Sequence, residues 1–126
     1  QKLCPCHSGN TYPNCCAPFH SGVRAQTAEQ MMRSRYSAYV LKLADYLRDT
    51  WHASTRPNDL TTESLDGIKW HKLEVIASEM QDATHATVTF NAIFKIGQKK
   101  NQSHLETSRF VHENGQWFYV DGDIND

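Results

Sequence analysis

Four cysteines gathered near the start of the chain restrict its folding more than any other feature. They are spaced as C-x-C, eight residues, then C-C: Cys4, Cys6, Cys15 and Cys16. Zinc takes four ligands, with sulfur at about 2.3 Å, and its charge relieves the repulsion among neighbouring thiolates. Ser8-Gly9-Asn10 and Pro13-Asn14 have the turn chemistry to bring the two pairs together. We therefore predict that the four cysteines bind one zinc ion.

Two disulfides are the alternative use of these cysteines. A bridge between Cys4 and Cys6, or between the neighbours Cys15 and Cys16, would be strained, because a relaxed disulfide needs Cα atoms about 5.5 Å apart. Crossed pairs such as Cys4 with Cys15 remain open. The chain shows no secretion leader and has no cysteine elsewhere, which favours zinc, although it begins at Gln1 and a trimmed start also remains open.

The metal is expected to be structural. His7 and His20 could each replace a sulfur ligand, but four sulfurs already complete the shell, so we expect both histidines at the surface. A closed shell leaves no position for water or substrate. Such a site contributes on the order of 10 kcal/mol to folding. Without zinc, residues 1–20 should be disordered while the rest stays folded.

Length and charge exclude several classes of function. A chain of 126 residues makes one main domain with at most a small appendage. Lys and Arg number 13 and Asp and Glu 14, so no basic field predicts nucleic-acid binding. No apolar run approaches the roughly 18 residues of a membrane helix. We expect a cytoplasmic protein without a membrane anchor.

The first half of the chain has helical patterns. Thr27 and Gln30 form a capping box in which each side chain accepts the other's backbone N–H, so a helix should start near Ala28. An apolar stripe that should pack on a sheet follows at steps of three and four: Met32, Tyr36, Tyr39, Val40 and Leu43. Other faces carry Arg33, Ser37 and Lys42. Further elements are a helical piece over 44–51, a loop over 55–59 and a short helix over 62–66.

The second half alternates with period two. The clearest strand runs through Ala86, Val88, Phe90, Ala92, Phe94 and Ile96, with polar residues between them. Asn114-Gly115 is a strong hairpin signal, because both central positions of such a turn need positive φ. Strands are also expected over 73–78, 105–112 and 116–121. Helices followed by an antiparallel meander predict an α+β fold with the sheet wrapping the helices.

The cysteine segment CPCHSGNTYPNCC resembles the SEC-C motif, a short zinc-binding segment best known from the tail of the protein-secretion ATPase. Its four cysteines match the ligands of that motif. The motif usually has Gly where His7 stands here. It usually has lysines at four further positions, occupied here by Asn10, Thr11, Pro13 and Asn14. Because those lysines would attract acidic partners, the resemblance implies chaperone or ribosome binding only weakly.

Most of the remaining chain resembles the YchJ-like bacterial proteins, which join a SEC-C motif to an NTF2-like domain. The matching strings are Arg33-Ser34-Arg35-Tyr36, Thr50-Trp51-His52, Ser108-Arg109-Phe110 and Trp117-Phe118-Tyr119-Val120-Asp121-Gly122. The resemblance implies a zinc motif over 1–20 and an NTF2-like cone, helices against a curved antiparallel sheet, over 21–126. Many such proteins carry a second C-terminal cysteine motif; here it is either absent or trimmed. The family carries no established biochemical role.

A cone of this kind has a hollow between helices and sheet, and eight side chains from different elements could face it: Tyr36, Tyr39, Trp51, His52, Glu106, Arg109, Trp117 and Tyr119. The alternative is that the aromatic residues fill the core. His52 either favours a helix terminus or acts as a general base.

The charged residues have similar alternatives. Glu106 and Arg109 lie three apart on a strand and so face opposite ways. An inward Arg109 would need a carboxylate or an anionic ligand. Arg33 and Arg35 are expected to be exposed or ion-paired.

Two functions remain. In the first, a structural zinc knob docks onto another protein, and the whole is an adaptor with an NTF2-like scaffold rather than an enzyme. In the second, the cone binds a small molecule or acts as an isomerase, dehydratase or hydrolase through His52 or another polar residue. No phosphate-binding glycine loop, His-x-x-x-His pair or nucleophile elbow specifies a reaction. The resemblance also implies a homodimer through the open sheet face.

Overall fold

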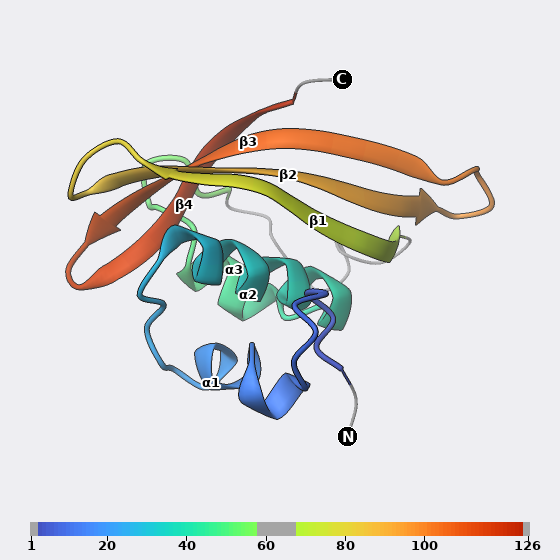
Figure 1. Ribbon diagram of the computed structural model, residues 1–126, viewed down its shortest axis with the longest axis horizontal. Helices are drawn as coiled ribbons and strands as arrows, with labels where there is room; N and C mark the ends of the chain where they lie inside the picture. The colour runs from blue at the N-terminus through green and yellow to red at the C-terminus, as the bar shows by residue number, and fades with distance from the viewer. Residues whose placement is uncertain (1–2, 58–67, 125–126) are drawn as a thin grey trace.

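A four-stranded antiparallel sheet dominates the computed structural model, which describes residues 3–57 and 68–124. The strands follow chain order: β1 Ile68–Met80, β2 His85–Ile96, β3 Gln102–Glu113 and β4 Gln116–Ile124. The helices lie together on one side of this sheet (Figure 1). The predicted order of helices followed by an antiparallel meander is confirmed.

The long helix α2, Ala28–Leu41, begins where its cap predicts. The Thr27 hydroxyl accepts the backbone N–H of Gln30 at 3.1 Å. The capping box also predicts that the Gln30 side chain accepts the N–H of Thr27. It accepts the N–H of Gln26 instead, at 2.8 Å, so this part of the prediction is wrong by one residue. The helix ends at Leu41, and the capping residue Lys42 takes a left-handed conformation with φ 60°.

Helix α2 is buried on two sides. Most of its apolar stripe packs under the sheet as expected, with Met32 and Tyr36 buried in the main core. Leu43 lies beyond the helix and packs instead against the small cluster that contains Ala44 and Leu47. On the opposite side lie the cysteine segment, the 3-10 turn η1 (Tyr12–Asn14) and the short helix α1 (Ala17–His20) (Figure 1). Ser37, which the stripe places on another face, is therefore fully buried. Three of the cysteines belong to the same core as the predicted NTF2-like domain. The predicted boundary at residue 20 between a zinc motif and that domain therefore stays a prediction.

Strand β2 has the predicted extent, whereas β1, β3 and β4 are longer than the strands expected over 73–78, 105–112 and 116–121. Asn114 and Gly115 take φ of 53° and 77°, which confirms the predicted turn between β3 and β4. Register shifts interrupt the ladder twice between β1 and β2 and once between β3 and β4. Such irregularities bend strands and increase their twist. They give the sheet the curvature needed to wrap α2.

A short helix α3, Ala44–Asp49, leads the chain back to the sheet. The predicted helix runs to Trp51, but here the backbone leaves it earlier to pair with β4: the Tyr119 N–H bonds Thr50 O at 2.9 Å and the His52 N–H bonds Tyr119 O at 2.7 Å. The predicted helix over 62–66 and the end of the predicted loop over 55–59 lie outside the described residues. No helix in the described ranges has the length and apolar character that crossing a membrane requires.

Candidate metal centre and cavity

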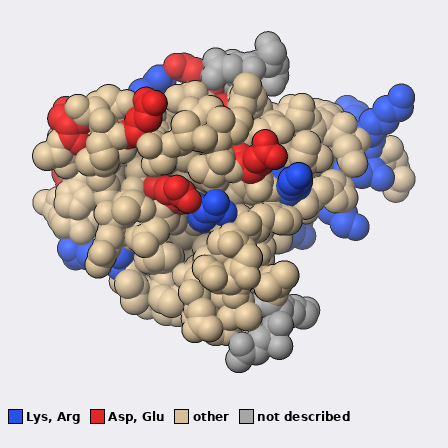
Figure 2. Space-filling view, in the orientation of Figure 1, with Lys and Arg blue, Asp and Glu red and all other residues tan. Residues whose placement is uncertain are grey.

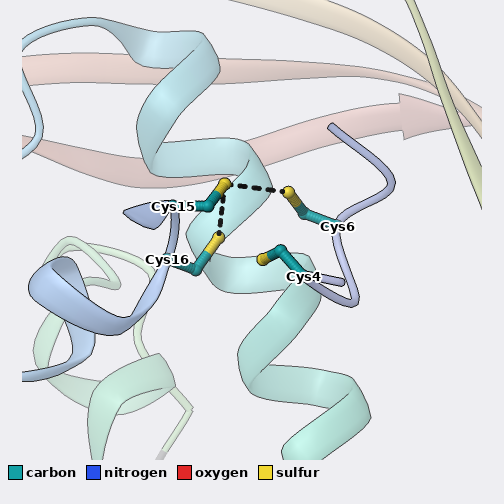
Figure 3. Close-up of side chains that lie close together, drawn as sticks. All are labelled: Cys4, Cys6, Cys15 and Cys16. Carbon is teal, nitrogen blue, oxygen red and sulfur yellow. Dashed lines mark hydrogen bonds between the residues drawn. The ribbon is translucent and has the colours of Figure 1, made fainter. Parts of the chain in front are cut away.

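The four cysteine sulfurs converge on one point between the N-terminal segment and α2 (Figure 3). All four Sγ atoms lie within 4.8 Å of one another. Cys6 and Cys15 are 3.5 Å apart at sulfur, and Cys15 and Cys16 are 3.9 Å apart. A tetrahedral site with zinc–sulfur bonds of about 2.3 Å has edges of about 3.8 Å. The cluster thus has the dimensions of a four-sulfur metal site.

The same distances argue against disulfides. All four cysteines are free thiols. A disulfide bond is about 2.0 Å long, far shorter than either sulfur separation. The crossed pairs left open by the sequence are therefore not formed in this structure.

Hydroxyl groups from two elements surround the sulfurs. Ser37 on α2 donates to Cys16 Sγ at 3.3 Å, and its oxygen lies 3.4 Å from Cys4 Sγ. Ser8 lies 3.1 Å from Cys15 Sγ. Such contacts orient metal ligands and spread their charge. A pattern search for cysteines alone misses Ser37, because nothing local indicates which face of α2 the cysteine segment covers.

The thiols of Cys6, Cys15 and Cys16 differ in pKa. The pKa of Cys6 is lowered, first by a hydrogen bond from Cys16 and also by Ser8. The pKa of Cys16 is raised by that same bond and by burial, and the pKa of Cys15 is raised by burial and by the Cys6 charge. One thiolate therefore opposes the ionisation of its neighbours. A bound cation would allow the others to ionise.

His7 holds a backbone conformation that suits glycine. Its φ is 63°, in the left-handed region that L-residues occupy at a cost of roughly 1–2 kcal/mol. This explains physically why the SEC-C motif usually has glycine there. The side chain is exposed, as expected.

We predict that His7→Gly raises the unfolding free energy of the metal-loaded protein by about 0.5–1 kcal/mol. Chemical denaturation measures this gain. The matched control is Asn10→Gly, at an exposed residue outside the positive-φ set, where glycine should lower stability instead. A loss of stability in both variants would contradict the prediction.

His20 contradicts its expected surface position. It is half-buried, and both ring nitrogens are bonded internally. Its Nε2 donates to the Ser34 carbonyl at 2.8 Å, so Nδ1 accepts from the Tyr12 hydroxyl at 2.6 Å. Burial lowers the pKa of His20. It secures α1 against α2 and is already fully bonded without a metal.

A cavity of about 310 Å³ lies between α2 and the sheet. The helix contributes Met32, Arg35, Tyr36 and Tyr39. The sheet contributes residues from all four strands, including Trp70, Phe90, His104, Glu106, Ser108 and Tyr119. The cone is therefore not completely filled by its aromatic side chains.

Four of the eight predicted pocket residues line this cavity: Tyr36, Tyr39, Glu106 and Tyr119. The other four lie elsewhere. Trp117 is buried at 3 % exposure and donates to Gln26 O at 3.3 Å. Trp51 packs edge-on against Tyr119 at 5.1 Å between ring centres.

His52 and Arg109 are used on the outer surface. His52 Nε2 is 3.0 Å from Glu113, and Nδ1 is 2.7 Å from Ser54 Oγ. Arg109 pairs with two exposed carboxylates on β4, at 2.5 Å to Asp121 and 2.7 Å to Asp123. Neither residue lines the cavity. Arg109 therefore does not point inward, and it pairs with surface carboxylates rather than with a ligand in the cavity.

Arg35 is the cation that the fold turns inward. We expect it exposed or ion-paired, but it is only 4 % exposed. Its Nη1 donates to Leu47 O at 2.8 Å and to Thr50 Oγ1 at 2.7 Å. The guanidinium lies over the rings of Trp51 and Tyr119, 5.1 and 4.6 Å from their centres. Burial lowers the pKa of Arg35, and the two rings and the neutral oxygens of Leu47 and Thr50 stabilise its positive charge.

Arg33 is ion-paired, as expected: its side chain lies 3.0 Å from the Glu29 carboxylate.

Comparison with known proteins agrees with this architecture. Residues 27–122 match the family model for the middle, NTF2-like domain of YchJ. A UPF0225 protein of Bordetella pertussis is 48% identical over 124 residues, covering 96% of this chain and 92% of the relative. The chain belongs to the YchJ-like family. A UPF0225 protein of Ralstonia nicotianae is 49% identical over 132 residues, covering 96% of the chain and 90% of its own length.

Two solved structures resemble this YchJ-like chain along nearly its whole length. A SEC-C motif containing protein from Rhodopseudomonas palustris has a TM-score of 0.86 and 35% identity and covers 98% of both chains. Another from Psychrobacter arcticus has a TM-score of 0.82 and 30% identity, covering 98% of this chain and 82% of its own. The YchJ-like fold therefore includes the cysteine segment as well as the NTF2-like domain.

Proposed function

We propose that the four cysteines bind one structural zinc ion, and that the chain is a zinc-stabilised binding module. The convergence of four thiols within 4.8 Å carries this proposal. Three of the four are buried, and a shell of four sulfurs has no open position for a substrate. The metal would join the N-terminal segment to α2 without taking part in a reaction.

Native mass spectrometry with elemental analysis tests the metal. We expect one zinc per chain, and its loss when Cys15 and Cys16 are both replaced by serine. A matched control, Ser54→Ala at the exposed turn beside His52, should keep the metal. Iron in place of zinc, or no metal with four free or oxidised thiols, would overturn the proposal. The native mass also reports whether the chain forms the homodimer implied by its family.

The zinc segment is further proposed to dock onto another protein in the cytoplasm. Residues 3–20 contain no Lys, Arg, Asp or Glu, and the lower part of the molecule in Figure 2, where this segment lies, shows no charged atoms. Leu3 is 67% exposed there. This favours apolar contacts over the charge attraction that lysines give other SEC-C motifs. Photochemical cross-links, which need neither a lysine nor a carboxylate, are expected from a partner to residues 3–20; photochemical cross-links confined to the sheet would contradict this role.

A small-molecule site in the cone is the second candidate, and the cavity favours it. His52 does not take part, because it lies outside the cavity. Any such site must use the residues that line the space under α2.

A further inference from the structure

The polar end of the cavity is built by alternate residues of β3. His104, Glu106 and Ser108 share one face of the strand. Glu106 accepts from His104 Nε2 at 2.7 Å, from Ser108 Oγ at 2.5 Å and from the Tyr119 hydroxyl at 3.5 Å. An ionised carboxylate has about four acceptor positions, so these donors leave one open. The Glu106 side chain is 13% exposed and can be reached from the cavity.

A glycine on the neighbouring strand makes room for this carboxylate. A Cβ atom built at Gly122 would lie 2.3 Å from Glu106 Oε2. Any side chain at that position would push the carboxylate away. The glycine at position 122 therefore leaves the space that the Glu106 carboxylate occupies.

Two side chains of opposite charge, Arg35 and Glu106, line the cavity. Arg35 lies over the face of the Tyr119 ring, and the hydroxyl of the same ring bonds Glu106. The positive group and the negative group therefore both contact Tyr119, one at its ring face and the other at its hydroxyl. Because transferring an unpaired charge into a buried site is costly, this arrangement favours a neutral ligand over an ionic one.

The remaining walls suit a flat apolar body. Trp70 packs against Tyr36 and Tyr39 with ring centres 5.5 and 5.8 Å apart. Phe90 also lines the space. A volume of about 310 Å³ lies at the small end of the roughly 300–1,000 Å³ of ligand pockets. This size fits one ring or two fused rings.

We propose that this cavity binds a neutral one- or two-ring molecule that donates one N–H or O–H hydrogen bond to Glu106. The site is separate from the metal centre, and the proposal rests on the second candidate function, a small-molecule site in the cone. Glu106 is the polar anchor, and the aromatic side chains supply the apolar contact.

Indole and 1-methylindole are matched probes, because they share the ring system and only indole has a donor. We expect calorimetry on the metal-loaded protein to show that indole binds more tightly. Glu106→Gln should weaken indole about tenfold, because a hydrogen bond to a charged acceptor is lost, and should change 1-methylindole less than about twofold. Glu113→Gln, on β3 but outside the cavity, is the control and should change neither.

Location and charge preference are tested on the same protein. Ala92→Leu, which fills the space beside β2, should abolish binding of both probes. Amide shifts induced by indole in the unmodified protein should centre on residues near 90–92 and 104–108, which locates the site even if that variant does not fold. The proposal is overturned by no indole binding at millimolar concentration, by shifts centred elsewhere, or by an unchanged affinity in Glu106→Gln. Tighter binding of tryptamine or indole-3-acetate than of indole would overturn the preference for a neutral ligand.

Discussion

Removing the metal with a chelator is expected to lower the Tm of the whole chain by more than about 10 °C, because a structural zinc site contributes on the order of 10 kcal/mol. Apart from the cysteines, the apolar side chains of residues 3–20 that pack against the core are Tyr12 and Phe19, both partly buried, so this segment should lose protection against amide exchange first. Cys4, Cys6 and Cys16 belong to the same core as Met31 and Met32. Protection around Ser37 on α2 should therefore fall as well.

Differential scanning calorimetry and hydrogen–deuterium exchange measure the two effects. The control is chelator added to the variant with Cys15 and Cys16 replaced by serine, where no further shift should occur. Equal protection of residues 3–20 with and without chelator would contradict the structural role. Loss confined to those residues, with α2 unchanged, would instead support an independently folding zinc motif.

Arg35→Lys is expected to lower the unfolding free energy by about 2–4 kcal/mol although it keeps the charge. Lysine lacks the planar group that lies on the Trp51 and Tyr119 rings, and it cannot bond Leu47 O and Thr50 Oγ1 in the same fork. Its ammonium would be buried without the ring contacts. Chemical denaturation at neutral pH measures the loss.

Arg35→Met is the matched comparison. It keeps most of the apolar volume and removes the buried charge, so it should lose less stability than Arg35→Lys. Burial should depress the pKa of the introduced lysine below its free value of about 10.4. The unfolded chain then binds more protons, so the stability of Arg35→Lys should rise with pH up to about 10. Wild-type stability in Arg35→Lys, or a less stable Arg35→Met, would contradict the role assigned to the rings.

Local sequence patterns predict a helix, strand or turn well where the signal depends only on residues that are close together in the chain. The alternation from Ala86 to Ile96 predicts β2, and Asn114-Gly115 predicts the last hairpin, because both signals depend on neighbouring residues alone. The end of α3 is predicted less well. Its last turn is given up for backbone pairing between Thr50 and Tyr119, residues far apart in the sequence.

The candidate sites divide in the same way. The four cysteines are adjacent enough in sequence for their chemistry to predict a common site. The cavity cannot be predicted so directly, since its walls come from α2 and all four strands. His104 lies one residue before the predicted start of its strand, and so the face that it shares with Glu106 is not evident from the pattern.

Residue patterns alone predict the clustering of the four cysteines, the order of helices and strands, and the resemblance to the YchJ-like family. Packing between elements that are distant in the sequence sets which arginine is buried, where His52 and Arg109 lie, and how Ser37 contacts the sulfurs. The physical reason is that α2 is covered on two sides. Spacing along a helix tells which residues share a face, whereas burial depends on what packs against each face.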